Sequence, residues 1–162
     1  MPVQSVLSIG VIGTPGCGKT TLCKELGLPI ISVRDFADEH GCLGEIESDG
    51  AAEIDVEKLA KLWVNPSELT LIDGHLAHHL PVDALVVVRC NPKELKKRLE
   101  ARGYSERKIQ DNIEVEMLGG PWSDLIGDSR PIFEGEGVRE WITSGCPNHT
   151  TPDMAIDWLS TP

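Results

Sequence analysis

The chain is short of basic residues and of long apolar runs. Its 162 residues include 15 Lys and Arg against 26 Asp and Glu, a formal net charge of −11. Neutralising nucleic-acid phosphates requires Lys and Arg, so we expect no strong direct binding of nucleic acid. Val3–Ile12 and Leu85–Val88 are much shorter than the roughly 18 apolar residues of a membrane helix, so we expect no membrane partner. The N-terminus also lacks the basic region and cleavage pattern of a secretory signal, which favours a cytoplasmic location.

Cysteine is too sparse and too irregularly spaced for a disulfide framework or a cysteine-rich zinc site. The chain has an odd number of cysteines and no C-x-x-C pair. The five are Cys17, Cys23, Cys42, Cys90 and Cys146. We expect free thiols in a reducing compartment, of which Cys17 alone has a position where the thiol could be exposed.

Apolar runs of strand length alternate with segments of helical periodicity, with no internal repeat and no linker. The predicted strands are Val6–Ile12, Pro29–Val33, Leu69–Asp73, Ala84–Cys90 and Val138–Thr143. The predicted helices are Lys19–Leu26, Asp35–His40, Val56–Trp63, Pro92–Arg102, Ser105–Leu118 and a last one opened by Thr151 and Pro152. This alternation predicts one α/β domain with a parallel sheet covered by helices on both faces. Gly41–Glu53 is predicted to be a mobile excursion rather than core, and Gly119–Gly137 has no predicted element.

The strongest motif lies between the first predicted strand and helix. Residues 13–20 read Gly-Thr-Pro-Gly-Cys-Gly-Lys-Thr and match the G-x-x-x-x-G-K-[ST] pattern of a phosphate-binding loop. Glycines at 13, 16 and 18 let successive backbone N–H groups curve around phosphate oxygens without Cβ clashes. Lys19 supplies a positive charge for the β and γ phosphates of ATP, and the Thr20 hydroxyl is a ligand for Mg²⁺. The alternative interpretation is a glycine turn with a solvated lysine.

A carboxylate at the end of another strand supplies a second candidate Mg²⁺ ligand. The apolar residues of Leu69–Asp73 lead directly into Asp73, and Gly74 allows close approach. His75 would lie near the same phosphates, where it could position a water or a hydroxyl and titrate near its ordinary pKa of about 6.5. The alternatives are a strand-end cap for Asp73 and a surface histidine for His75.

Three histidines also have the spacing of a helical metal site. His75, His78 and His79 are related by i, i+3 and i+4. Pro81 and the lack of a carboxylate within the group argue against metal binding.

Four cations surround a predicted break between two helices. Arg98, Arg102, Arg107 and Lys108 lie on either side of Gly103. Phosphoryl transfer requires cations that close over the developing charge, and a glycine break between helices suits a short lid. Arg102 is the first candidate for contact with the nucleotide.

Together these residues resemble a known family, the archaeal and eukaryotic adenylate kinase 6 family, also called CINAP-type kinases. The matching segments are Gly13–Thr21, Asp73–His75, Arg102–Ile109, Asp111–Ile113 and Glu116. The resemblance runs from about Val6 to Met117 and is weaker through the C-terminal segment. The phosphate loop alone would be generic, whereas an Arg-Gly-Tyr lid joined to an Asp-x-His strand end is more specific.

The resemblance implies a P-loop NTPase fold of the nucleoside monophosphate kinase type. Residues 1–162 would form a single domain with a five-stranded parallel sheet flanked by helices on both faces. Such a protein uses ATP and Mg²⁺, transfers the γ-phosphoryl group to AMP and also hydrolyses ATP. The family further acts in maturation of the small ribosomal subunit by contacting a platform ribosomal protein.

The resemblance also implies roles for individual residues. The ATP-contacting set would be Gly13, Gly16, Cys17, Gly18, Lys19, Thr20, Thr21 and Arg102. The catalytic set would be Lys19, Asp73, His75 and Arg102, with Thr20 and Asp73 as metal ligands. The monophosphate-binding insertion would span about 32–53, with Arg34 and Asp35 as contacts, and the lid about 101–111. Many relatives have Ala-Arg-Glu where this chain has Ala37-Asp38-Glu39, so Arg34 would have to compensate for Asp38.

Three functions follow as hypotheses. The first is an adenylate kinase that makes two ADP from ATP and AMP. The second is an ATP-hydrolysing ribosome assembly factor with little kinase flux, which would contact a basic ribosomal protein because the chain is acidic. The third is a kinase of another small metabolite, such as a shikimate-type enzyme, which is weakened by the missing glycine-rich and acidic signature of that ligand.

Overall fold

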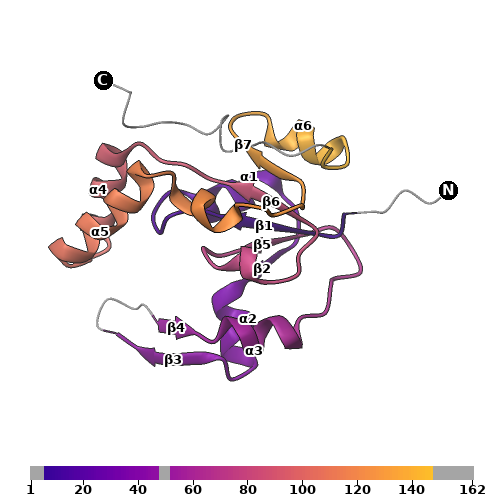
Figure 1. Cartoon of the computed structure of the whole chain (residues 1–162), viewed down its shortest axis with the longest axis horizontal. Helices are drawn as coiled ribbons and strands as arrows, with labels where there is room; N and C mark the ends of the chain where they lie inside the picture. Colours follow the sequence, from indigo (N-terminus) through magenta and orange to yellow (C-terminus); the bar gives the residue numbers. More distant parts are fainter. Residues whose placement is uncertain (1–5, 48–51, 148–162) are drawn as a thin grey trace.

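A computed structural model describes residues 6–47 and 52–147 of the chain. At its centre is a parallel sheet in the order β2-β5-β1-β6-β7 (Figure 1). Its strands are β1 (Ser8–Ile12), β2 (Ile30–Ser32), β5 (Thr70–Asp73), β6 (Ala84–Val87) and β7 (Ile132–Glu134). All four strand pairings are parallel, so the predicted five-stranded parallel α/β sheet is confirmed.

Alternate residues of the central strands pack against helices on opposite faces of the sheet. Ile9 and Val11 of β1 belong to the apolar cluster that contains residues of α1 (Lys19–Leu26) and α6 (Val138–Thr143). Ile12 belongs to the cluster with α2 (Val33–Glu39) and α3 (Val56–Leu62). Both faces are therefore buried, which accounts for near-continuous apolar runs in place of an alternating pattern.

A third apolar cluster lies beneath the phosphate loop. It joins Leu95 and Leu99 of α4 (Pro92–Ala101) to Ile109 of α5 (Glu106–Met117) and to Cys17. Helix α4 begins at the predicted Pro92, and α5 begins one residue after the predicted Ser105. Asn91 accepts a hydrogen bond from the Lys93 backbone N–H, and Ser105 accepts one from that of Lys108. The α4–α5 pair projects to one side of the sheet (Figure 1).

The segment after α2 is a β-hairpin and contributes to the core. β3 (Leu43–Ile46) and β4 (Ala52–Ile54) pair antiparallel. Cys42 is buried just before β3, and Leu43 and Ile54 pack against the same cluster. The interpretation of Gly41–Glu53 as an excursion outside the core is therefore wrong for Cys42 and Leu43, which pack against the cluster, whereas Gly41, residues 44–47 and Glu53 are exposed as expected.

The sequence prediction of the fifth strand is wrong. Val138–Thr143 is helix α6 and not a strand, because Val138, Trp141 and Ile142 have i, i+3, i+4 spacing and pack onto the sheet. The fifth strand is β7, whose three residues lie within the glycine- and proline-rich segment Gly119–Gly137, for which the sequence predicts no element. That segment also contains a 3₁₀-helix, η2 (Gly120–Leu125).

The predicted helix that begins at Thr151 lies outside the described residues. Among the helices that the structure describes, none has the length and apolar character needed to cross a membrane.

Candidate active site

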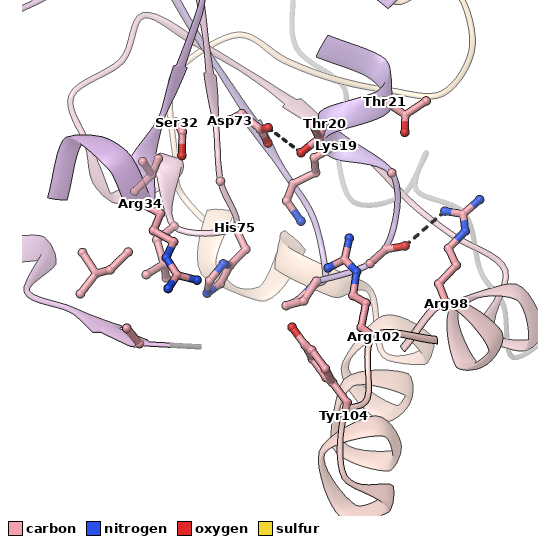
Figure 2. A pocket seen from close by; sticks show the side chains of 18 of the residues that line it. Lys19, Thr20, Thr21, Ser32, Arg34, Asp73, His75, Arg98, Arg102 and Tyr104 are labelled. Carbon is pink, nitrogen blue, oxygen red and sulfur yellow. Dashed lines mark hydrogen bonds between the residues drawn. The ribbon is translucent and has the colours of Figure 1, made fainter. Parts of the chain in front are cut away.

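Most of the site residues predicted from the sequence line one cleft. It has a volume of about 720 Å³ and lies at the carboxyl ends of β1, β2 and β5, where parallel α/β sheets bind their ligands. One end is lined by the phosphate loop and by Arg98, Arg102 and Tyr104 (Figure 2). The other end is lined by residues that follow β2 and by β4. Asp73, Gly74 and His75 line it as well.

The phosphate loop connects β1 directly to α1, as the motif predicts. Gly16 and Gly18 have φ angles of 89° and 103°, in the left-handed region that favours glycine. A Cβ on Gly16 would lie 2.9 Å from Leu99 Cδ2, so the loop can rest on α4 only with glycine there. Gly13 and Cys17 belong to the loop but are not among the described residues that line the cleft.

The cation and the oxygen donors of the loop lie within one network. Lys19 Nζ donates hydrogen bonds to the carbonyl oxygens of Gly13 and Thr14, at 3.1 and 3.2 Å. Thr20 Oγ1 donates to Asp73 Oδ2 at 2.7 Å (Figure 2). A hydroxyl and a carboxylate side by side, next to a phosphate-binding loop, are the donor set that Mg²⁺ takes together with phosphate oxygens. The residues present therefore fit this metal.

His75 is aimed into the cleft, but its ionisation differs from the sequence expectation. Removal from bulk water lowers its pKa to about 4, and the positive charge of Lys19 adds to this effect. The residue is exposed at the cleft, and the nearby positive charges of Lys19 and Lys108 act on the ring in the same direction as desolvation. The expectation that His75 titrates near 6.5 is therefore wrong, and its imidazole is neutral at physiological pH.

Two of the four predicted lid cations reach the cleft. Arg98 and Arg102 line it, and the Arg98 guanidinium donates to the Gly16 carbonyl oxygen at 3.2 Å (Figure 2). Arg107 is exposed and is not among the described lining residues. Lys108 lies 4.9 Å from the centre of the Tyr104 ring and 3.6 Å from a carboxylate oxygen of Glu47. The lid therefore contacts the β3–β4 hairpin through a charged pair.

Among the residues that the structure describes, the second end of the cleft is lined by one cation and by apolar side chains. Arg34 lines it together with Ser32, and Val33 and Ile54 supply apolar surface. Asp35 is not among the described lining residues, and its backbone N–H donates to Ser32 Oγ at 3.3 Å. The structure thus brings Arg34 to the cleft and leaves the Asp35 side chain outside it.

The Cys17 thiol is buried, contrary to the expectation that it could be exposed. Its side chain faces the cluster under the loop with Leu95 and Leu99. Burial raises the pKa of this thiol to about 11, although the charge of Lys19 opposes the shift. Cys17 is therefore a packing residue, and its Sγ also lies 4.0 Å from Lys19 Nζ within the loop.

The structure brings a carboxylate to His78 that the local sequence lacks. His78 Nε2 lies 3.0 Å from Asp124 Oδ2, and His79 stands beside His78, whereas His75 is not part of this group. His78 Nδ1 is buried and has no hydrogen-bond partner within 6–47 and 52–147. A metal-ligating histidine normally donates its other ring N–H to an acceptor, so the geometry favours a buried histidine paired with Asp124.

Sequence reasoning did not assign a role to the buried charges behind the loop. Glu116 is fully buried and accepts a hydrogen bond from the Thr14 hydroxyl, and Arg89 pairs with it. A signal existed, because Glu116 lies seven residues after Ile109 and in phase with the apolar stripe of α5. A charged residue at such a position requires buried partners.

One family model and two named relatives each match more than half of the chain. Residues 9–119 match the family model described as "AAA domain". The "Putative adenylate kinase" of Thermococcus onnurineus is 40% identical over 159 residues, which cover 94% of this chain and 82% of that protein. The protein of the same name from Pyrococcus abyssi is 39% identical over 134 residues, 78% of this chain and 72% of that protein.

A solved structure shares the fold. The crystal structure of a "putative kinase" from Chloroflexus aurantiacus has a TM-score of 0.54 to this chain at 15% identity, covering 89% of this chain and 100% of that one. At that identity the likeness concerns the P-loop α/β fold alone.

Proposed function

This chain belongs to the AAA domain family and is related to archaeal proteins named "Putative adenylate kinase", and from that premise we propose that it is a nucleoside monophosphate kinase that transfers the γ-phosphoryl group of ATP to AMP. The observation that carries the proposal is the continuity of the cleft. It runs from the phosphate loop, past Asp73 and His75, to Arg34. A donor phosphate and an acceptor phosphate can therefore meet in one cavity.

The donor end suits the triphosphate of ATP. The loop offers backbone N–H groups and the Lys19 ammonium, and Arg98 of α4 and Arg102 of the lid also line this end. Thr20 and Asp73 would hold Mg²⁺, which when bound neutralises phosphate charge. In a loose phosphoryl-transfer transition state, charge spreads over the transferred group, and fixed cations around it are the main source of catalysis.

The acceptor end suits a nucleoside monophosphate. The Arg34 guanidinium can pair with a phosphate through two hydrogen bonds, and Val33, Ala52 and Ile54 offer apolar surface to a base. A phosphate oxygen of AMP attacks the γ-phosphorus, the bond to the β–γ bridging oxygen breaks, and two ADP molecules leave. The acceptor phosphate has no hydroxyl proton to lose when dianionic, so this transfer requires no general base.

His75 favours ATP hydrolysis as a second activity of the same site. A neutral imidazole beside the γ-phosphate position can orient an attacking water through a hydrogen bond. Hydrolysis would allow the protein to act as an ATP-driven assembly factor for the small ribosomal subunit. With a net charge of −11, its partner there would be a basic platform ribosomal protein rather than RNA.

The test compares ADP formation and phosphate release with and without AMP. We expect AMP to accelerate ADP formation well above AMP-independent hydrolysis. Arg34→Ala should raise the KM for AMP by about 10-fold or more, because it removes a charge-assisted phosphate contact, and should leave AMP-independent hydrolysis nearly intact. Arg107→Ala, which removes an exposed cation outside the cleft, is the matched control and should change neither rate. Equal loss of both activities in Arg34→Ala would place this residue on ATP or in the fold instead.

A further inference from the structure

A network of buried charges lies directly behind the phosphate loop. Glu116, at the C-terminal end of α5, has a side chain that is 0% exposed, and the side chains of Arg89 and Glu134 are 1% and 2% exposed. Arg89 Nε donates to Glu116 Oε2 at 2.9 Å, and its Nη1 donates to Glu134 at 3.1 Å. Charged groups are rarely buried to this degree unless their partners are fixed in place.

The Glu116 carboxylate binds a residue of the phosphate loop directly. Thr14 Oγ1 donates to Glu116 Oε1 at 2.8 Å, across 102 positions of sequence. The other oxygen, Oε2, accepts from the backbone N–H of Cys90 at 2.7 Å as well as from Arg89. The carboxylate thus joins the loop after β1 to the segment after β6.

The backbone of Thr14 in turn contacts the rest of the phosphate loop and Lys19. Its carbonyl oxygen accepts hydrogen bonds from Lys19 Nζ at 3.2 Å and from the Cys17 backbone N–H at 3.1 Å. The hydroxyl of one residue is therefore bound to Glu116, while its carbonyl shapes the loop around Lys19.

We propose that Glu116 is a positioning residue that sets the conformation of the phosphate loop through the Thr14 hydroxyl, and thereby the placement of Lys19 against the phosphates of ATP. Glu116 does not touch the cleft and acts only through Thr14. The inference deepens the proposed function and rests on the ATP end of that site.

A carboxylate suits the chemistry of this buried position. Glu116 accepts hydrogen bonds from the Thr14 hydroxyl, the Cys90 N–H and the Arg89 Nε, and its negative charge balances the buried guanidinium of Arg89. Packing leaves little freedom for adjustment, because a Cβ on Gly120 would lie 2.9 Å from Glu116 Oε1. Gly120 also has a φ of 61°, so glycine is favoured there for two reasons.

The network also ties the lid to the loop. Helix α5 begins near Tyr104 at the cleft, and its last turn carries Glu116 behind the loop. A rotation of α5 that moves Glu116 away from the loop would therefore break the hydrogen bond between Thr14 Oγ1 and Glu116.

The test uses a pair of substitutions at Thr14. Thr14→Val removes the hydroxyl and keeps the shape, and Thr14→Ser keeps the hydroxyl. Dissociation constants for ATP and the values of kcat and KM for ATP and AMP are measured together with thermal unfolding. A loop misplaced by a fraction of an ångström loses alignment, so we expect Thr14→Val to lower kcat/KM for ATP by about 10- to 100-fold, with the KM for AMP unchanged. Thr14→Ser should restore values within about threefold of wild type.

The matched control is Glu134→Gln, which perturbs the same buried network from the side away from the loop. It should lower the unfolding temperature and leave ATP affinity unchanged. If Thr14→Val binds and turns over ATP like wild type, or if Glu134→Gln weakens ATP affinity as much as Thr14→Val does, Glu116 serves only the fold and the inference is overturned.

Failure of the proposed function is distinguishable from failure of this inference. If wild type does not phosphorylate AMP, the acceptor assignment fails, while the ATP dissociation constants of the Thr14 pair still decide the role of Glu116.

Discussion

Lys19→Ala separates the chemistry of the phosphate loop from its contribution to the fold. The substitution deletes an ammonium whose two hydrogen bonds go to the carbonyl oxygens of Gly13 and Thr14. The side chain is only half-buried, so both carbonyls and the truncated site can be hydrated. Loss of these two bonds should lower the free energy of unfolding by no more than about 2 kcal/mol.

The effect on activity should be much larger than the effect on stability. A fixed charge at the transferring phosphoryl group contributes about 10²- to 10³-fold to kcat, so Lys19→Ala should reduce ADP formation at saturating ATP and AMP by at least about 10²-fold. Lys24→Ala removes an exposed cation from the last turn of the same helix and is the matched control. A coupled assay for ADP and an equilibrium denaturation curve are measured for each variant. Lys19→Ala with near-normal turnover, or with turnover and folding lost in parallel, would refute the reasoning.

Four further predictions concern the ionisation, activity and packing of the site. His75 should titrate near pH 4 in the protein without nucleotide, because desolvation and Lys19 lower its pKa, and an NMR titration with a midpoint near 6.5 would contradict this. His75→Gly should reduce AMP-independent ATP hydrolysis more than AMP-dependent ADP formation, and parallel losses would instead make His75 structural. Cys17, with a pKa of about 11, should be thiolate in only about one molecule in a thousand at pH 8, so mass spectrometry after brief iodoacetamide treatment should find it unmodified; rapid alkylation would show an open loop. Leu99→Ala should lower the free energy of unfolding in urea by about 2–5 kcal/mol, because the side chain is fully buried beneath the loop, and a loss under about 1 kcal/mol would show that the cluster there is loose.

The sequence alone was sufficient to predict those elements whose start and end are marked by neighbouring residues. Helix α1 has the predicted bounds, because the loop glycines precede it and Gly27 ends it in a left-handed conformation. The strand that leads into Asp73 was recognisable for the same reason, since a short apolar run ending in an acid is a contiguous pattern. The phosphate loop likewise depends on neighbouring residues, so its identity needs no tertiary information.

Where local preference was ambiguous, packing decided the outcome. Val138–Thr143 has β-branched and aromatic residues that suit a strand, yet its apolar positions face the sheet only as a helix. β7 has three residues, too few for a periodic signal, and exists because it pairs with β6. The hairpin after α2 similarly depends on its contacts with the core.

The sequence by itself therefore determined the parallel α/β architecture, the phosphate loop and the acidic strand end, because each depends on residues close together in the chain. Only the tertiary structure decided which distant groups meet. Arg34 lines the cleft and Asp35 does not. Desolvation and the charge of Lys19 lower the pKa of His75. The Thr14 hydroxyl donates a hydrogen bond to Glu116, 102 positions away in the sequence. No local sequence pattern encodes these outcomes, because they depend on how distant elements pack together. How deeply a charged group is buried, and which partner it meets, are decided only in the assembled core.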